Sequence, residues 1–472
     1  MNRLPFSHRR ADRVTRVLLT ALAVLLLPLA GVQAQPAPRP AAAAVEVRPS
    51  PLQVNYTQFT LANGLNVILH EDHTVPVVTV NVWYNVGSGR EKPGRTGFAH
   101  LFEHLMFMGS GHVKEGQFDR LLEAAGGDNN GSTNEDRTNY WINVPSNALE
   151  LALFLESDRM GYLLDAMTPA GVDAQRDVVK NERRQSYENR PYGMASIVLG
   201  EMLFPESHPY RWPTIGYMPD LSAATYEDVV EFFKRYYAPN NASLSIAGDI
   251  DIAATRAMVE RYFGEVKRGA FVEPVAPPAA VLTAVKQRTL PDKVQLPRLY
   301  LAWLTPPLLA PGDAALDAAA SVLAGGKNSR LYKRLVYDLQ IAQNVSAVQG
   351  SQSLASVFGI VVTPRPGHTL EEVQQVVDEE LEKLRESPPS ARELDRVVHQ
   401  AEASFYARME QVGGFGGKGD QLNAYYTQTG NPDYFAEDLA RYRALSPSDV
   451  RAAVRQFLPK DRRVELRVVP EK

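Results

Sequence analysis

The sequence predicts an α+β protein built from two similar domains. Stretches that alternate as β-strands do are interspersed with longer stretches of helical periodicity. One helix–strand pair also recurs: a helix beginning at Asp228 precedes a strand at 242–247, and a helix beginning at Asp449 precedes a strand at 464–469. The two copies lie 221 residues apart, and a chain of 472 residues with 44% hydrophobic content is too long for one ordinary domain.

The domain boundaries follow from composition. Residues 271–291 are rich in Pro and Ala and are predicted to form a linker. This places a first domain at 52–270 and a second at 292–472.

The N-terminal segment has the pattern of a secretory signal. Residues 1–34 combine five Arg with an apolar run and end in Val32-Gln33-Ala34, which predicts cleavage after Ala34. A membrane anchor is the alternative, but Pro28 interrupts a run already shorter than the roughly 20 apolar residues of a spanning helix. Residues 35–51 are expected to be a Pro- and Ala-rich leader. We therefore expect a periplasmic or secreted protein without a membrane contact after cleavage.

The charge of the mature chain and its lack of Cys limit what kind of protein this can be. Without residues 1–34 the formal charge falls from −4 to −8, so nothing indicates nucleic-acid binding. The chain contains no Cys, which excludes disulfides and a lipid anchor attached through a lipobox Cys.

The first domain is expected to alternate between strands and helices. In order, the predicted elements are a hairpin at 59–69 with its turn at Asn63-Gly64, a strand at 77–86, a helix within 97–109, a helix at 118–125, a polar loop at 126–133, a strand at 139–144, and helices at 147–164 and 170–187. The strand at 139–144 is a candidate sheet edge because so polar a loop leads into it.

The helix within 97–109 carries the sequence His100-Leu101-Phe102-Glu103-His104. On a helix, His100 and His104 stand one turn apart on one face, so both imidazoles can reach one ion, with Glu103 beside them. A carboxylate in that position is suited to activating water next to a metal. A pair of ordinary buried His residues is the alternative, but unpaired polar groups in so apolar a helix cost roughly 2–7 kcal/mol each.

A third ligand cannot be chosen from spacing alone. Glu182 follows His104 by 78 residues and lies in the charged run Lys180-Asn181-Glu182-Arg183-Arg184, where a surface Glu needs no special explanation.

The His100–His104 motif and the run from Gln175 to Arg184 together resemble the zinc site of the pitrilysin family, which includes insulysin and the mitochondrial processing peptidase. The resemblance implies that His100, His104 and Glu182 bind one zinc ion per chain and that Glu103 is the general base. It also implies two homologous α/β-sandwich domains that form half of a clamshell. Family members often carry Glu at the position of Gln175, whose amide could still hydrogen-bond behind the ligands. A site of two His and one Glu also accepts cobalt or manganese.

The same resemblance implies how substrate binds. Asn130-Gly131 matches the position where a family edge strand pairs with an extended peptide, so Asn130 and Gly131 are candidate substrate-binding residues. The expected activity is a zinc-dependent endopeptidase. The alternative is a non-catalytic structural or peptide-binding subunit of the same family.

The second domain is expected to lack a metal site. Its helix at 314–323 contains no His, and the family Arg and Tyr that bind substrate fall on Val336 and Gln343, which cannot replace them. We therefore expect a heterodimer with a homologous subunit that lacks the zinc motif but carries the Arg/Tyr pair. The alternative is a homodimer in which Arg334 and Tyr337 substitute. The glycine-rich run 413–419 lacks a phosphate-binding pattern and is predicted to be a flexible loop.

Overall fold

The computed structural model describes residues 52–471. The predicted signal peptide (1–34) and leader (35–51) lie outside the described residues. Within 52–471, no helix combines the length and apolar character needed to cross a membrane.

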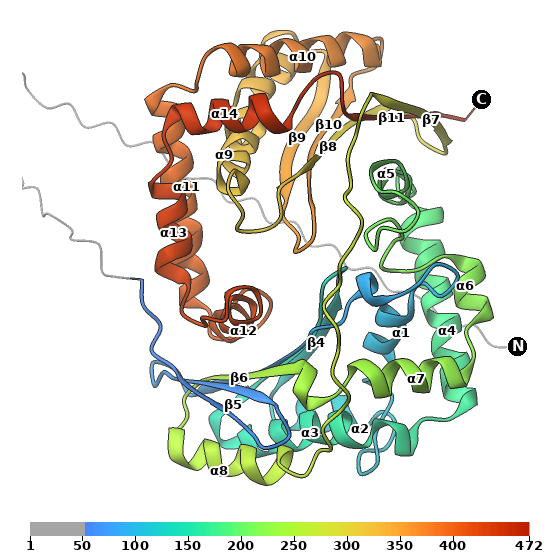
Figure 1. The fold of residues 1–472 in the computed structure, drawn as a ribbon, viewed down its shortest axis with the longest axis vertical. Helices are drawn as coiled ribbons and strands as arrows, with labels where there is room; N and C mark the ends of the chain where they lie inside the picture. Colours follow the sequence, from blue (N-terminus) through green and yellow to red (C-terminus); the bar gives the residue numbers. More distant parts are fainter. Residues whose placement is uncertain (1–51, 472) are drawn as a thin grey trace, which may run out of the picture. The chain divides into compact units, whose positions relative to one another are not determined.

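The first half of the chain forms a six-stranded sheet (Figure 1). Its strand order is β1-β2-β6-β3-β5-β4, and all neighbours are antiparallel except β2 and β6. The strands are β1 (Thr57–Thr60), β2 (Asn66–Glu71), β3 (Val77–Tyr84), β4 (Asp128–Thr133), β5 (Thr138–Pro145) and β6 (Ala242–Gly248). The predicted hairpin is confirmed, because Thr60 pairs with Asn66 across a turn in which Gly64 has a φ of 92°.

The second half forms a five-stranded sheet that repeats this arrangement. Its order is β7-β11-β8-β10-β9, again with one parallel pair, β7 and β11. The strands are β7 (Lys286–Asp292), β8 (Arg298–Thr305), β9 (Ala342–Gly350), β10 (Ser356–Pro364) and β11 (Val464–Pro470). Strands β7, β11, β8, β10 and β9 thus correspond to β2, β6, β3, β5 and β4, which confirms the predicted repeat.

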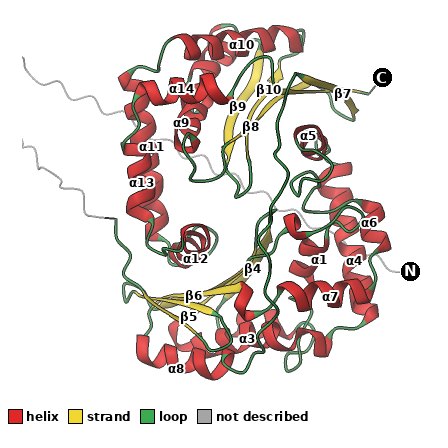
Figure 2. Ribbon diagram, viewed as in Figure 1, coloured by secondary structure: helices red, strands yellow, loops and turns green. Residues whose placement is uncertain are grey.

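Helices accompany both sheets (Figure 2). Those of the first half are α1 (Phe98–Leu105), α2 (Gln117–Ala124), α3 (Leu149–Ala166), α4 (Pro169–Arg183), α5 (Ala195–Leu203), α6 (Met218–Ala223), α7 (Tyr226–Tyr236) and α8 (Ile252–Phe263). Those of the second half are α9 (Asp313–Ala324), α10 (Leu370–Glu386), α11 (Ala391–Glu410), α12 (Lys418–Thr429), α13 (Phe435–Arg443) and α14 (Pro447–Phe457). Short 3₁₀ or π turns complete the set: η1 (Ser88–Arg90), η2 (Ser146–Ala148), η3 (Arg184–Glu188), η4 (Pro239–Asn241) and η5 (Tyr332–Asp338).

Each sheet has one apolar core face. In the first half, alternating residues such as Val80, Val82 and Ile142 are fully buried against the helices α1, α2, α3 and α8. In the second half, residues such as Leu301, Phe358 and Ile360 pack against α9, α10 and α14.

The opposite face of each sheet is covered by a helix from the other half of the chain. Helix α12 packs on β3 and β6, where Asn423 donates to the backbone oxygen of Asn81 and accepts from the Ser243 hydroxyl. Helix α5 packs on β8 and β11, where Val198 joins a cluster with Leu466. These two helices occupy equivalent positions in the repeat, so packing crosses the predicted domain boundaries.

Two local predictions were wrong. Residues 128–133 of the predicted polar loop form β4, which is the edge strand, so the predicted edge strand at 139–144 (β5) lies inside the sheet between β3 and β4. Part of the predicted linker at 271–291 is strand, because β7 begins at Lys286. The predicted loop at 413–419 is confirmed for 413–417, while Lys418 and Gly419 begin α12. It lies against the first sheet, where Lys418 forms an ion pair with Asp72.

Candidate metal centre

Helix α1 directs the imidazoles of both predicted ligands, His100 and His104, to the same side. His100 and His104 lie one turn apart, and their ring centroids are 4.8 Å from each other. Burial lowers the pKa of His100 to about 4, so its imidazole is neutral near pH 7, the form that binds metals.

Glu182 reaches the same point from α4. Its Oε2 lies 3.6 Å from His100 Nε2 and 3.3 Å from His104 Nε2. One ligand atom from each of the three residues lies within 4.8 Å of the other two. The interaction with His104 is the main cause that lowers the pKa of Glu182 and keeps it anionic. Two imidazoles and a carboxylate that converge in this way fit the donor set of a catalytic zinc site, which leaves a further position open.

The end of α4 is held by the residue that follows Glu182. Arg183 is buried, donates through Nε to the Gly216 carbonyl at 2.9 Å and pairs with Glu188. Gly216 lies directly against Gly97, which precedes α1, and both glycines have positive φ values. The carboxylate on α4 is therefore positioned through the loop that begins α1.

Glu103 points from α1 toward the edge strand β4. A Cβ at Gly131 would lie 3.3 Å from Glu103 Cγ and 3.0 Å from Tyr140 Cδ1, so the bare backbone of β4 lies directly beside the carboxylate. Burial raises the pKa of Glu103, and an interaction with the Thr133 hydroxyl opposes this shift. A carboxylate with a raised pKa is a better proton acceptor than an ordinary surface Glu.

The start of α1 is anchored from outside the helix by Glu91. Its two carboxylate oxygens accept from the backbone N–H of Gly97 at 2.9 Å and of Ala99 at 2.8 Å. Burial raises the pKa of Glu91 to about 8, while these donors act in the opposite direction. In effect Glu91 supplies the N-terminal cap that Gly97 cannot.

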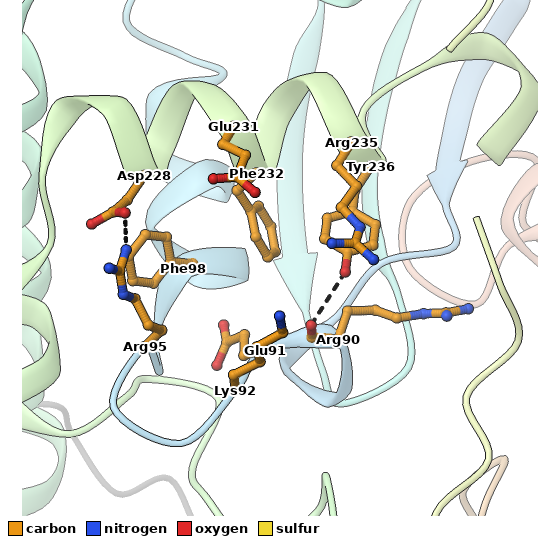
Figure 3. A pocket seen from close by; sticks show the side chains of 10 residues that line it. All are labelled: Arg90, Glu91, Lys92, Arg95, Phe98, Asp228, Glu231, Phe232, Arg235 and Tyr236. Atoms are coloured by element: carbon orange, nitrogen blue, oxygen red, sulfur yellow. Dashed lines mark hydrogen bonds and ion pairs between the residues drawn. The ribbon is translucent and has the colours of Figure 1, made fainter. Parts of the chain in front are cut away.

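Glu91 also lines a pocket of about 300 Å³ beside α7 (Figure 3). There Arg95 pairs with Asp228 of α7, and the Tyr236 hydroxyl donates to the Arg90 carbonyl. None of the predicted site residues lines this pocket.

The remaining predicted residues lie in two places. Asn130 and Gly131 are on β4, and the Asn130 side chain accepts from the Gly131 N–H. Gln175 lies about 10 Å along α4 from Glu182 and donates to Met108 Sδ. In the described part of the chain no hydrogen bond joins Gln175 to His100, His104 or Glu182.

Glu91, Thr133 and Arg137 belong to the surroundings of the centre but were not predicted. Arg137 is part-buried, donates to the Ser132 carbonyl at 2.8 Å and lies over the Trp83 ring. No signal in the sequence distinguishes Glu91 from the exposed charges around it. The polar run 126–137 contains Thr133 as its single β-branched residue, so its composition indicates a loop rather than an edge strand.

Comparison with known proteins decides the family. A family model described as "Insulinase (Peptidase family M16)" matches residues 66–199, and one described as "Peptidase M16 inactive domain" matches residues 223–401. The zinc protease PqqE of Helicobacter pylori is 31% identical over 361 residues, which cover 74% of this chain and 79% of that protein. The chain belongs to peptidase family M16. Within this M16 chain, the first match contains all four residues of the candidate centre and the second contains α9, which carries no His.

Solved structures agree with the M16 fold. The crystal structure of a protease from Helicobacter pylori matches with a TM-score of 0.81 and 26% identity, over 89% of this chain and 100% of that one. A structure from Pseudomonas fluorescens described as a peptidase M16 inactive domain matches with a TM-score of 0.76 and 21% identity, over 89% and 98% of the two chains. The two homologous halves therefore form the two-domain unit of this family, half of a clamshell.

Proposed function

We propose that this chain is a zinc-dependent endopeptidase that hydrolyses extended peptides. The observation that carries the proposal is the convergence of His100, His104 and Glu182 on one point, next to a carboxylate that faces an open strand edge. Zinc held by these three residues would supply Lewis acidity at the scissile amide. The predicted signal segment would place the mature chain in the periplasm or outside the cell.

Glu103 performs the proton transfers in this proposal. Its carboxylate accepts a proton from the attacking water and then donates it to the nitrogen of the leaving amine. Burial raises the pKa of Glu103, which favours uptake of that proton.

The substrate is proposed to extend the first sheet as an additional strand on β4. Of the described strands, only β5 pairs with β4, so its other edge is open. Main-chain pairing at this edge would bring a peptide bond close to Glu103, because Gly131 adds no side chain between them. Recognition through the backbone implies tolerance of many peptide sequences.

We further propose that the active enzyme is a heterodimer with a homologous chain that lacks the zinc motif. What supports this proposal is that the two positions aligned with the family's Arg and Tyr carry neither residue: Val336 packs against the second core, and Gln343 is exposed on β9. Arg334 forms ion pairs with Glu379 and Glu380 of α10, so its guanidinium is already engaged. Tyr337, the other residue of the homodimer alternative, is 73% exposed and therefore accessible to a partner chain.

The metal and the activity can be tested together. Purified protein is expected to contain about one zinc per chain by elemental analysis and to cleave an unstructured peptide. A chelator should remove both the metal and the cleavage, and added zinc should restore them. A chain that contains no zinc and cleaves nothing, even with its partner, would instead be the non-catalytic subunit.

The partner can be tested by mixing. We expect the isolated chain to cleave a labelled peptide at least about tenfold more slowly than the same chain mixed with a homologous subunit that carries the Arg/Tyr pair, since that pair binds substrate. A Tyr337→Ala variant serves as the control, because it should not change the mixed activity. Robust turnover by the purified homo-oligomer, lost in Tyr337→Ala, would contradict the heterodimer and support the homodimer.

A further inference from the structure

Asp420, at the start of α12, is a buried carboxylate that faces the first sheet. It is 7% exposed. Its Oδ1 accepts from Trp83 Nε1 at 2.9 Å, from Asn139 Nδ2 at 2.8 Å and from Asn81 Nδ2 at 3.2 Å. Its Oδ2 accepts from the Gly416 N–H at 2.8 Å. One residue of the second half therefore accepts hydrogen bonds from three side chains of strands β3 and β5.

These contacts continue to the edge strand β4. Because Asn139 gives its amide N–H to Asp420, its carbonyl oxygen faces the other way and accepts from the Ser132 hydroxyl at 2.6 Å. An Asn amide without such a partner can flip and present a donor where an acceptor is needed. The carboxylate of Asp420 thus determines which group Ser132 meets.

The backbone of Ser132 is held by a second route from the same carboxylate. Arg137 donates to the Ser132 carbonyl at 2.8 Å, and its guanidinium lies 5.3 Å from the centre of the Trp83 ring. That ring is in turn held by its hydrogen bond to Asp420. Both the side chain and the backbone of Ser132 therefore depend on one carboxylate.

Ser132 lies between the two residues of β4 that contact the proposed base. Gly131 approaches the Glu103 side chain, and the Thr133 hydroxyl interacts with its carboxylate. Alternation along the strand directs Ser132 to the face of α12 and its neighbours to the face of α1. A shift of Ser132 would move the open edge of β4 relative to Glu103.

We propose that Asp420 is a positioning residue that holds the edge strand β4 in the geometry that binds a peptide beside Glu103. The role rests on the proposed function, since it concerns the strand to which the substrate is proposed to bind. Through this role the second half supports the strand at which substrate is proposed to bind, although it contributes none of the three candidate metal ligands.

The decisive substitution is Asp420→Asn. The Asn side chain has one acceptor oxygen where Asp420 has two. Its NH2 group therefore faces either the Gly416 N–H or the three side-chain N–H donors, and the hydrogen bonds on that side are lost. In a parent chain carrying Glu103→Gln, binding of a fluorescein-labelled unstructured peptide is measured by anisotropy without turnover. We expect Asp420→Asn to weaken this binding about five- to tenfold, the effect of about one hydrogen bond. Zinc content should not change.

Two comparisons separate positioning from simple destabilisation. Ser132→Ala should weaken binding to a similar degree, and the double variant should bind no worse than either single variant, because both break the same connection. Asp438→Asn alters another buried carboxylate of this helical layer, which accepts from the Tyr425 hydroxyl, and should leave binding unchanged. Amide hydrogen exchange in 128–133 should rise in Asp420→Asn and not in Asp438→Asn.

The outcomes distinguish this inference from the proposed function. The positioning role would be overturned if the effects of Asp420→Asn and Ser132→Ala on peptide binding simply add. It would also be overturned if Asp420→Asn weakens binding no more than Asp438→Asn does. Either result holds even if the wild-type chain cleaves peptides. The expected binding pattern in a wild-type chain that never cleaves, alone or with its partner, would support the positioning role and refute the peptidase. A parent chain that binds no peptide, either alone or mixed with the homologous subunit that carries the Arg/Tyr pair, would overturn both.

Discussion

Glu103→Gln is expected to abolish peptide hydrolysis while leaving the zinc content of the chain unchanged. Gln has nearly the same shape, so α1 and its two imidazoles keep their places, but an amide cannot accept and return a proton. We expect kcat to fall by about 10²–10⁴-fold, the usual contribution of a general base, with little change in peptide affinity. Single-turnover cleavage measures the rate of hydrolysis, and elemental analysis of the same preparation measures the zinc content.

Glu123→Gln is the matched control for this experiment. Glu123 is an exposed residue of α2, and its replacement should leave kcat and zinc content as in the wild-type chain. The assignment of Glu103 as the base would be wrong if Glu103→Gln kept more than about a tenth of the activity, since a proton acceptor contributes far more than that.

Glu182→Ala is expected to cost the chain its zinc. The substitution removes one of three converging ligand atoms, and His100 and His104 alone leave two bonds to the ion. Affinity should fall by more than about a hundredfold, because even the loss of a residue that only supports a ligand costs 10–100-fold. Titration with a competing chelator measures the change, and His100→Ala and His104→Ala should behave in the same way.

Asp177→Ala provides the comparison on the same helix. Asp177 is exposed and pairs only with Lys180 in the described structure, so this variant should retain zinc and activity. A Glu182→Ala protein with its full zinc content would eliminate Glu182 as the third ligand.

The parts of the centre that could be predicted from the sequence are those governed by local geometry. Helical periodicity alone places His100 and His104 on one face with Glu103 beside them, and the structure has this arrangement. Glu182 is different, because no local rule relates it to His104, which lies 78 residues earlier on another helix. It became a candidate only through resemblance to a family, and the structure brings it within 4.8 Å of both imidazoles.

The features that escaped prediction depend on contacts between distant segments. The run 128–133 is so polar that it looks like a loop, yet pairing with β5 and support from Arg137 make it a strand. Glu91 stands between Arg90 and Lys92 like a surface charge, and only the folded chain turns it into the cap of α1. The glycine-rich run at 413–419 similarly has no local signal that it packs on the first sheet.

Because α12 of the second half covers the first sheet, the ribosome completes that sheet well before it synthesises the helix that covers it. All four residues of the candidate centre and every strand of the first sheet precede α8, whereas α12 follows about 150 residues later. At roughly 5–20 residues per second this delay is about 8–30 s. During that interval the side-chain N–H groups of Asn81, Trp83 and Asn139 lack the Asp420 carboxylate, which accepts from them in the folded chain. The residues of the candidate centre and the whole first sheet are thus present in the growing chain before the carboxylate that supports the proposed substrate-binding edge has been synthesised.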